Sequence, residues 1–243
     1  MDSRQYNVRP MRVPIRSPEI RDDPAAPAPE RAPSLGTGSR VWLVRHADVH
    51  DDWQQKAYGN LDVPLSPTGI RETEAVVDAF SKVPLSLVAS SPLSRALLLG
   101  KGLAEGAHAP LRIDERLREV WRGDWQGLSV DDFRSRWHAQ SAEFARDPWN
   151  WKGHGGESDA DIWERAWAAL REAALAARTA DEAGPTIALA THFNVIRVLV
   201  TRATGLRPSQ SFAFRNDTAR ASLIVDGPEG WTLARANVPA AEL

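Results

Sequence analysis

One stretch constrains the fold of this chain more than any other: Val41–Ala47, with the sequence VWLVRHA. An apolar run of strand-forming residues ends abruptly at a cation and an imidazole. In an open α/β sheet, such an ending lies at the carboxyl edge of a strand, where ligands bind. Arg45 and His46 are therefore candidate site residues, although a histidine at a strand end is structural or solvated about as often as catalytic, and an arginine beside one is usually a surface charge. Their meaning depends on whether other strands bring partners to the same edge.

Apolar strand patterns alternate with amphipathic helix patterns along the rest of the chain. Strands are predicted at 41–44, 85–89, 111–113, 186–190, 221–225 and 231–236, and helices at 67–82, 94–105, 158–180 and 193–204. The turn-forming residues 226–230 make the last two strands an antiparallel hairpin. The pattern predicts an α/β fold with three α/β/α layers, in which a mostly parallel sheet has an antiparallel edge.

Two regions depart from this alternation. Residues 1–39 are rich in proline and charge, so they are predicted to form a disordered N-terminal tail ahead of a domain at 40–243. Residues 114–158 read as a helical insertion, and five tryptophans fall within it: Trp121, Trp125, Trp137, Trp149 and Trp151. These indoles could form an aromatic wall for a substrate, but the core of a small helical cap is the favoured interpretation.

Composition excludes several classes of function. The formal net charge of −2 gives no broad basic field for nucleic acid or an anionic membrane. The absence of cysteine excludes disulfides, thiolate zinc sites and a cysteine nucleophile. We find neither an apolar stretch long enough to span a bilayer nor a signal peptide, so a cytoplasmic location is expected. Oligomeric state stays open.

Two further strands end in reactive side chains: Arg95 follows the strand at 85–89, and His192 follows the strand at 186–190. Two arginines and two histidines at one sheet edge make an anion site, and the planar guanidinium suits phosphate oxygens. Zinc is disfavoured because the arginines would repel the cation. A serine hydrolase is disfavoured because no G-x-S-x-G turn is present, and P-loop and dinucleotide motifs are also missing. Phosphoryl transfer to a histidine remains.

At this point the motifs carry a family resemblance. In chain order they are Arg45-His46-Ala47, Leu65–Gly69, Ser91–Arg95, Leu117–Glu119 with Gly123–Gly127, Gly155–Ser158 and Thr191-His192. Together they resemble the ordered motifs of the histidine phosphatase superfamily, the phosphoglycerate-mutase-like group, over most of residues 40–225. Residues 58–66 are further similar to the small phosphatase branch that includes α-ribazole phosphatases.

The resemblance implies a role for each residue of the site. His46 would be the nucleophile that forms a phosphohistidine, while Arg45, Arg95 and His192 would bind the non-bridging phosphate oxygens. Glu119 would protonate the leaving oxygen and afterwards activate water. Two neighbouring guanidiniums would favour the neutral imidazole that a nucleophile needs. No metal ion or other cofactor is then required.

Three further residues shape the expected pocket. Asn60 either contacts the substrate or has a plain loop role, and Phe193 offers an apolar wall to the leaving group at the mouth. Ala47 stands where the family most often has glycine, so its Cβ would narrow the approach to phosphate or forbid a positive φ.

The leading hypothesis is a metal-independent phosphomonoesterase acting on a small phosphorylated metabolite. One alternative is a cofactor-dependent phosphoglycerate mutase, which the resemblance disfavours because residues 48–54 lack the expected asparagine after the tryptophan. Another is a non-catalytic scaffold that binds a phosphorylated ligand. The partner is expected to be a small-molecule phosphate ester, and the sequence does not define its leaving group.

Overall fold

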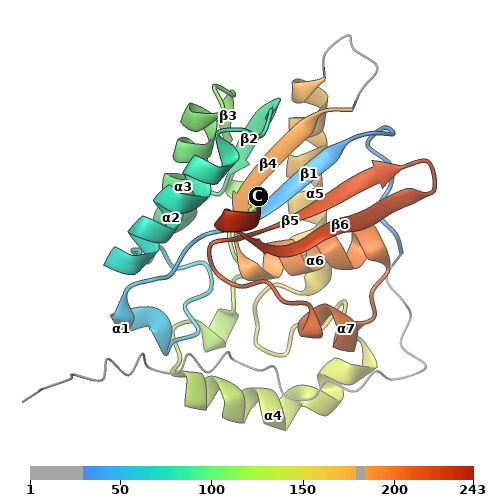
Figure 1. Ribbon diagram of the computed structural model, residues 1–243. Coiled ribbons are helices and arrows are strands. Elements are labelled where there is room, and N and C mark those ends of the chain that lie inside the picture. Colours follow the sequence, from blue (N-terminus) through green and yellow to red (C-terminus); the bar gives the residue numbers. More distant parts are fainter. Residues whose placement is uncertain (1–29, 179–183) are drawn as a thin grey trace, which may run out of the picture.

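A six-stranded sheet runs through the computed structural model, which describes residues 30–178 and 184–243 (Figure 1). Its strands are β1 (Arg40–Arg45), β2 (Leu87–Ser90), β3 (Leu111–Ile113), β4 (Thr186–Thr191), β5 (Arg220–Gly227) and β6 (Gly230–Pro239). They lie in the order β3-β2-β4-β1-β5-β6. The first four in the chain pair in parallel, and β5 and β6 pair antiparallel. The predicted mostly parallel sheet with an antiparallel edge is therefore confirmed.

Two pairs of helices cover the two faces of the sheet (Figure 1). The helices α2 (Pro67–Phe80) and α3 (Ser94–Gly106) share a buried apolar cluster with Trp42 and Val44. On the other face, α5 (Asp159–Ala177) and α6 (Phe193–Thr204) share a cluster with Val41 and Leu43. Successive side chains of β1 thus pack into opposite cores, as the two-residue period of a strand requires. This arrangement confirms the predicted α/β/α layers.

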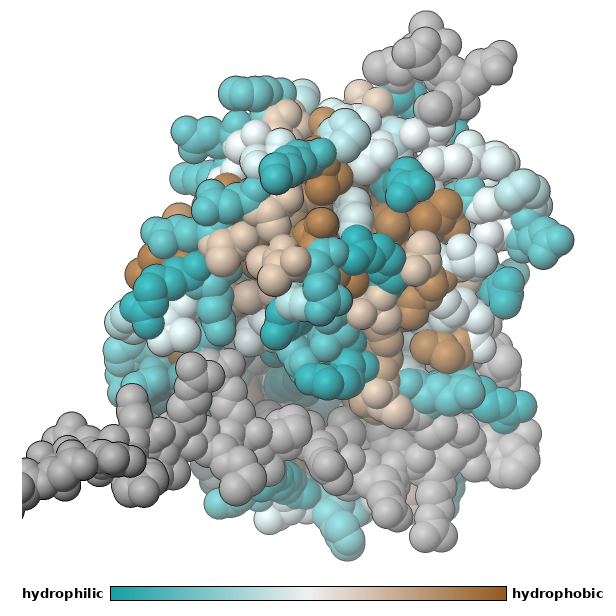
Figure 2. All heavy atoms as spheres, in the orientation of Figure 1, coloured by the Kyte–Doolittle hydropathy of each residue, from teal (hydrophilic) through white to brown (hydrophobic). Residues whose placement is uncertain are grey.

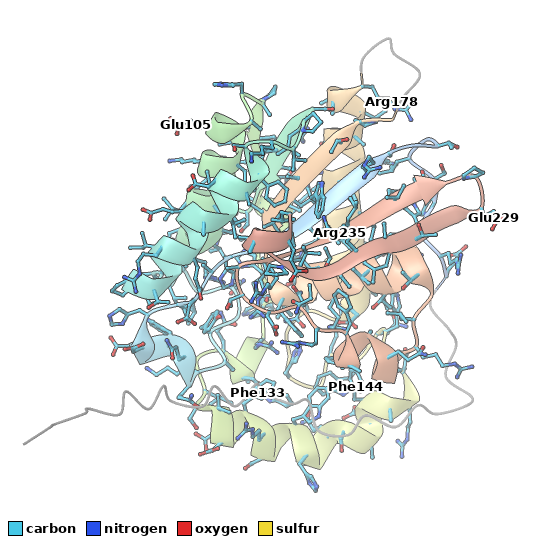
Figure 3. All side chains as sticks on the ribbon, in the orientation of Figure 1. Glu105, Phe133, Phe144, Arg178, Glu229 and Arg235 are labelled. Atoms are coloured by element: carbon cyan, nitrogen blue, oxygen red, sulfur yellow. The ribbon has the colours of Figure 1, made fainter. Side chains whose placement is uncertain are left out.

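The insertion at 114–158 contains the 3-10 helices η1 (Glu115–Leu117) and η2 (Gly123–Trp125) and the helix α4 (Val130–Arg146), and Figure 1 shows α4 at the bottom of the view. Its start belongs to the core beneath α5 and α6, through Leu117 and Val120, and the rest forms a cap. The cap has its own apolar cluster of Trp125, Trp137, Phe144 and Trp151. Phe133 and Phe144 of α4 contact these indoles (Figure 3). The interpretation of the tryptophans as the core of a cap is confirmed for Trp125, Trp137 and Trp151. Trp149 packs against the main core instead, and Trp121 is 49% exposed.

Three other short elements were not predicted. They are α1 (Asp51–Gln54), α7 (Pro208–Ala213) and η3 (Ala240–Glu242). Each is only a few residues long, so none carries enough apolar residues for a helical period to be recognised. No helix among the described residues is long and apolar enough to cross a membrane. Hydrophilic and apolar residues are mixed on the face shown in Figure 2.

Residues just before the predicted start of the domain, at residue 40, pack against it. Residues 1–29 lie outside the described residues, but residues 30–39 contact the domain. The backbone N–H of Leu35 and the hydroxyl of Ser34 both donate to the carboxylate of Asp226, each at 2.7 Å. Leu35 is buried in the cluster beneath α5 and α6. Composition misses this segment because a distant carboxylate and one apolar side chain hold it.

The buried face of α2 agrees only in part with its apolar periodicity, which predicts Ile70, Ala75, Val76, Ala79 and Phe80. Val76 and Phe80 are buried, together with Gly69 and Thr73, whereas Ile70 and Ala75 are exposed. Gly69 faces the polypeptide that follows β1, where a Cβ would collide with the backbone of Asp48. This close approach fixes the rotation of the helix, because only glycine tolerates it.

Candidate active site

Three neighbouring strands bring the predicted residues to one edge of the sheet. The register aligns Arg45 with Thr191, so His46 and His192 both follow strand ends that lie side by side. The backbone N–H of His46 extends this ladder by donating to the carbonyl of Thr191 at 3.1 Å. The ring centroids of the two histidines are 5.1 Å apart, with the planes tilted by 58°. Adjacent parallel strands thus place two imidazoles against each other.

His46 is buried, and its hydrogen bonds define its tautomer. Its Nδ1 lies 2.7 Å from the carbonyl oxygen of Ala47. A carbonyl oxygen only accepts, so Nδ1 carries the proton and Nε2 carries the lone pair. The Nε of Arg95 donates to this Nε2 at 3.3 Å. The nitrogen available for attack therefore lies beside the cation that would hold an anionic substrate.

The surroundings of His46 keep its imidazole neutral. Burial lowers the pKa of His46 well below its ordinary value, and the charges of Arg95 and Arg45 lower it further. The hydrogen bond to the carbonyl of Ala47 opposes this shift. The sequence predicted the repulsion by the two guanidiniums, but burial is the larger cause.

Arg95 is fully buried at the start of α3 and points its guanidinium at the site. Its Nη1 donates to the carbonyl of Leu61 at 2.7 Å, and its Nη2 donates to the carbonyl of Gly59 at 2.9 Å. The ring of Tyr58 lies 5.1 Å from the guanidinium carbon. Two carbonyls and an aromatic face thus hold the guanidinium while its Nε faces His46.

The loop that supplies these carbonyls is fixed by an unusual helix cap. The first residue before α3, Leu93, offers no side-chain cap, and Asp62 supplies one from the loop instead. Its Oδ1 accepts from the backbone N–H of Ser94 at 2.8 Å and from the Ser94 hydroxyl at 2.7 Å. A carboxylate at a helix N-terminus is favoured by the helix dipole. Asp62 therefore fastens the loop to the helix that carries Arg95.

Arg45 lies on the other side of His46. Its Nη1 donates to the carbonyl of Asn216, and its guanidinium carbon lies 5.1 Å from the centroid of the Phe193 ring. The side-chain amide of Asn216 donates to the carbonyl of Phe193 at 3.2 Å. Among the described residues, the buried Nε of Arg45 has no acceptor. Phe193 thus packs beside a site cation, and an N–H of that cation is available to a ligand.

His192 is buried at the end of β4, and Ser91 is its hydrogen-bonding partner. Its Nε2 lies 2.8 Å from the hydroxyl of Ser91, which follows β2. Its Nδ1 is buried and has no partner in the described part of the chain. Burial lowers the pKa of His192 well below its ordinary value, with Arg95 and His46 adding to the shift. His192 is therefore neutral near pH 7. Because the hydroxyl of Ser91 can donate to its Nε2, its Nδ1 can carry the proton and donate to a ligand.

Glu119 comes from the insertion and is also buried. Its carboxylate accepts from the backbone N–H of Val120 at 2.8 Å, and the N–H of Asn194 lies 3.3 Å from both of its oxygens. Asn194 is in the first turn of α6, just after His192. By contrast, Glu115 is exposed and pairs with Arg118. The structure therefore brings Glu119, rather than Glu115, to the same edge as the histidines.

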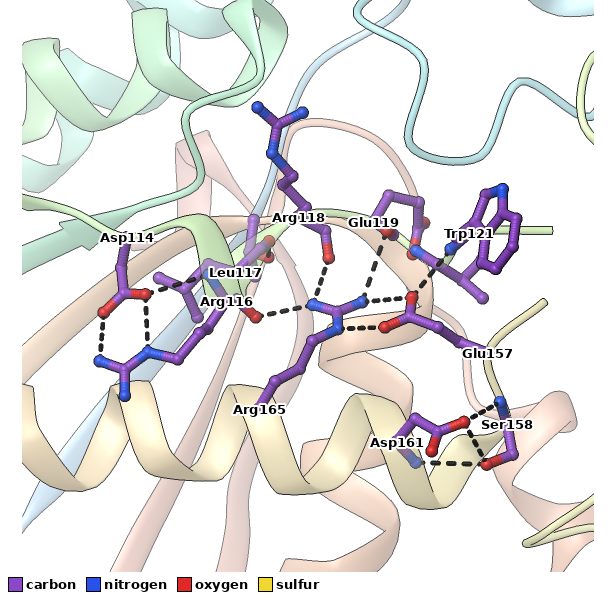
Figure 4. A network of polar contacts seen from close by, with 12 residues as sticks. Asp114, Arg116, Leu117, Arg118, Glu119, Trp121, Glu157, Ser158, Asp161 and Arg165 are labelled. Atoms are coloured by element: carbon purple, nitrogen blue, oxygen red, sulfur yellow. Dashed lines mark hydrogen bonds and ion pairs between the residues drawn. The ribbon is translucent and has the colours of Figure 1, made fainter. Parts of the chain in front are cut away.

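A side-chain clamp holds the backbone that carries Glu119 (Figure 4). Arg165 of α5 donates from Nη1 to the carbonyls of Arg116 and Arg118, at 2.6 and 2.7 Å. Its Nε and Nη2 bind the carboxylate of Glu157, at 2.7 and 3.0 Å. Glu157 in turn accepts from the backbone N–H of Trp121 at 2.9 Å. One ion pair thus fixes the chain on both sides of the acid.

Asn60 joins the loop near Arg95 to the insertion. Its Oδ1 accepts from the side-chain amide of Gln126 at 2.7 Å, and Gln126 accepts from the backbone N–H of Arg122 at 3.1 Å. The structure therefore gives Asn60 the loop role, and its contact with a substrate stays a prediction. Among residues 30–178 and 184–243, no group of three or more histidine and carboxylate side chains is arranged to hold a metal ion.

The position of Ala47 does not require the positive φ that alanine would disfavour. In the described chain, the non-glycine residues with positive φ are His108, Ala219 and Asn237, so Ala47 has an ordinary backbone conformation. Alanine is therefore accommodated there without backbone strain, and its carbonyl oxygen accepts a hydrogen bond from Nδ1 of His46.

Sequence reasoning missed two partners of this site. Ser91 belongs to a motif that the sequence analysis quoted, and its position after β2 could have indicated a contact with the neighbouring strand end. Arg165 gave no such signal, because a single arginine on a long amphipathic helix is usually a solvated residue.

The chain is similar to known proteins in sequence and in fold. Residues 41–239 match the family model of the histidine phosphatase superfamily (branch 1). A glucosyl-3-phosphoglycerate phosphatase of Mycolicibacterium vanbaalenii is 31% identical over 170 residues, which are 69% of this chain and 75% of that protein. The native structure of a mycobacterial glucosyl-3-phosphoglycerate phosphatase superposes with a TM-score of 0.70 and 27% identity, covering 82% of this chain and 99% of that one.

The expected likeness to α-ribazole phosphatases is also found. The adenosylcobalamin/α-ribazole phosphatase of Salmonella typhimurium is 30% identical over 87 residues, which are 36% of this chain and 43% of that protein.

Proposed function

Because the chain belongs to the histidine phosphatase superfamily, we propose that it hydrolyses phosphate monoesters without a metal ion, through a phosphohistidine on His46. That it is a phosphatase of small phosphate esters follows from the family and from its likeness to phosphatases. The phosphohistidine rests on one observation. The Nδ1–H of His46 is bound to the carbonyl of Ala47, so the lone pair of Nε2 lies in the plane of the ring beside Arg95.

In the first half of the reaction, the phosphate binds between the cations at the sheet edge. The Nε–H of Arg45 and the Nδ1–H of His192 have no partners in the described chain and donate to its oxygens. Nε2 of His46 attacks phosphorus, and the bond from phosphorus to the ester oxygen breaks. The carboxyl group of Glu119 gives its proton to that oxygen, so the alcohol leaves uncharged.

In the second half, Glu119 acts as a base. Its carboxylate takes a proton from water as the water oxygen attacks phosphorus, and the bond between phosphorus and Nε2 breaks. Inorganic phosphate leaves, and both His46 and Glu119 return to their starting protonation states. Fixed positive charge stabilises the equatorial oxygens throughout, which is the main requirement of phosphoryl transfer.

The proposed substrate is a small phosphorylated metabolite. The relatives of this chain include phosphatases named for glucosyl-3-phosphoglycerate and for α-ribazole, and these two compounds have different leaving groups. The sheet edge binds only the phosphate, so the insertion and the loop at 58–62 would select the alcohol.

The test is a search for the covalent intermediate. The full chain is mixed with a phosphate ester labelled in its phosphorus, in the presence of a metal chelator, and quenched in alkali. We expect turnover despite the chelator and a bound label that is stable to base and released by acid. The His46→Ala variant should lose both the label and the turnover, whereas His138→Ala, which changes an exposed histidine of α4, should keep them.

Activity that requires a metal ion and survives in His46→Ala would refute the proposal. The interconversion of phosphoglycerates in the presence of bisphosphoglycerate, measured on the same protein, separates a phosphatase from a mutase. Binding of phosphate esters with no turnover of any of them would instead indicate a scaffold.

A further inference from the structure

Arg122 is a half-buried cation in the loop that carries Glu119. It lies three residues after the acid and directly before η2. Its guanidinium carbon lies 5.1 Å from the centroid of the Phe133 ring, which covers one face of the group. Within the described part of the chain, its guanidinium has neither a hydrogen bond nor an ion pair. Arg122 therefore presents its N–H groups without an acceptor.

The neighbouring arginines of this region differ from it in this respect. Arg116 pairs with Asp114 at 2.7 Å, Arg165 pairs with Glu157 at 2.7 Å, and Arg197 pairs with Asp159 at 2.5 Å. A guanidinium withdrawn from water costs free energy unless an anion compensates it. These arginines have that compensation inside the protein, and Arg122 does not.

Charged groups of the site affect the guanidinium of Arg122. Burial lowers the pKa of Arg122, the charge of Glu119 opposes this shift, and Arg197 adds to it, while Tyr58 and Asp159 have smaller raising effects. Tyr58 is the residue whose ring packs on Arg95. The guanidinium of Arg122 thus lies in the electrostatic field of the acid and of the loop that holds the phosphate-binding arginine.

The backbone of Arg122 is fixed relative to that loop. Its N–H donates to Gln126, which is bound through its amide to Asn60. The adjacent Gly59, whose carbonyl accepts from Arg95, approaches Gln126 so closely that a Cβ there would collide with it. The cation of the insertion and the cation of the sheet edge are therefore held by one connected set of loops.

We propose that Arg122 is a specificity-determining residue that binds a carboxylate on the leaving alcohol, so that the preferred substrates are phosphorylated hydroxy acids. This inference rests on the proposed phosphatase function. A planar guanidinium matches a planar carboxylate with two parallel hydrogen bonds. Because Phe133 already orients the group, little side-chain freedom is lost when the carboxylate binds.

A single negative charge fits this position better than a second phosphate. His154, whose pKa Arg122 lowers, has its pKa depressed to about 4, chiefly by burial. It is therefore neutral near pH 7 and adds no second cation beside Arg122. A dianionic phosphate in the same place would bring more negative charge than one guanidinium can balance.

The experiment compares two substrates that differ only in the carboxylate. The ratio of kcat/KM for 3-phosphoglycerate to kcat/KM for glycerol 3-phosphate is measured with the full-length protein. We expect the unmodified protein to favour 3-phosphoglycerate and Arg122→Gln to reduce the ratio by about 10- to 100-fold, as for the loss of a charged hydrogen bond. Arg122→Lys keeps the charge without the planar fork and should give an intermediate ratio.

A matched control is Arg118→Gln, which changes a partly exposed arginine of the same loop that pairs with Glu115. It should leave the ratio unchanged. An unmodified protein that hydrolyses both esters without preference, or an Arg122→Gln variant with an unaltered ratio, overturns the inference and leaves the phosphatase function standing. Failure to hydrolyse these esters and p-nitrophenyl phosphate would instead refute the proposed function.

Discussion

The sheet edge and the insertion reach the same site by different physical means. His46 and His192 follow two adjacent parallel strands, and the backbone ladder between β1 and β4 fixes their spacing. Glu119 lies in an irregular segment with no strand beside it, and the ion pair of Arg165 with Glu157 fixes it instead. The register of a buried sheet tolerates almost no change, because a slip by one residue reverses every side chain.

This difference assigns separate tasks to the two regions. In the proposed mechanism, the sheet edge holds the groups that every phosphate ester requires, whereas the insertion holds the acid and the groups proposed to face the alcohol. Residues on loops vary more easily than the scaffold that positions them. We therefore expect substitutions at the sheet edge to affect the hydrolysis of every phosphate ester. Substitutions in the insertion should instead change which leaving group is preferred.

The largest effect is expected at the sheet edge. His46→Ala removes the nucleophile, so kcat should fall by at least about a thousandfold for every phosphate ester, whatever its leaving group. Steady-state kinetics with p-nitrophenyl phosphate and an alkyl phosphate measure this. A variant that loses activity on only one of the two esters would contradict the assignment of His46 to the common chemistry.

Glu119→Gln should produce a loss that depends on the leaving group. An alkoxide needs a proton as it departs, so kcat on an alkyl phosphate should fall by about 10²- to 10⁴-fold. The p-nitrophenolate ion leaves without one, so its formation should fall much less in a single-turnover burst. Glu115→Gln, at an exposed residue of the same segment, is the control. Equal losses on both esters would mean that Glu119 acts in some other step.

The contrast between the two regions also explains what the sequence could predict. His46, Arg95 and His192 were recognisable because apolar runs end at them, and the ends of parallel strands meet at one edge. The partners that hold Arg95 were not recognisable. The carbonyls that hold Arg95 belong to a loop, and the cap from Asp62 that fixes the loop reaches across 32 positions of sequence.

The insertion was harder still to predict. Its tryptophans indicated a core, but no periodicity distinguished α4 from the irregular segments around it. Glu119 was identified through a family motif, because Glu115 and Asp124 lie nearby in the sequence and the residue types alone do not distinguish the three carboxyl groups. Arg122 was not singled out, because its lack of a partner is a property of the folded surroundings and not of the residue.

The clamp itself can be broken with a smaller effect. Arg165→Met leaves Glu157 and the carbonyls of Arg116 and Arg118 without their donor, so the free energy of unfolding should fall by about 1–3 kcal/mol. Because the segment that carries Glu119 is then less well fixed, alkyl phosphate turnover should fall by about tenfold, as expected when a catalytic group is slightly displaced.

Denaturant unfolding and steady-state kinetics measure the two effects of Arg165→Met together. Arg112→Met removes an arginine that pairs with Glu172 away from the acid, and it serves as the control. If both variants reduce turnover equally, the clamp has no special effect on Glu119.

The smallest effect is expected at His154, and it concerns stability. This residue packs against Trp125 and Trp151 inside the cap. Its pKa falls from 6.5 to about 4, mainly through burial and the charge of Arg122, while Asp159 and Glu157 oppose the shift. The folded pKa is below the unfolded one, so the unfolded chain binds the extra proton between these two values. Stability contributed by His154 is complete above pH 6.5 and is lost as the pH falls towards 4.

His154→Asn removes this titration and keeps an acceptor for the N–H of Gly156, which donates to Nδ1 at 2.9 Å. The variant should therefore lose less stability than the unmodified protein below pH 6.5, by about 1 kcal/mol per pH unit, in urea unfolding measured at a series of pH values. His46 and His192 titrate with the same sign in both proteins, so their contribution cancels in the comparison. Parallel curves for the two proteins would mean that His154 is not buried in its neutral form, and that the cap is less tightly closed than the sheet edge.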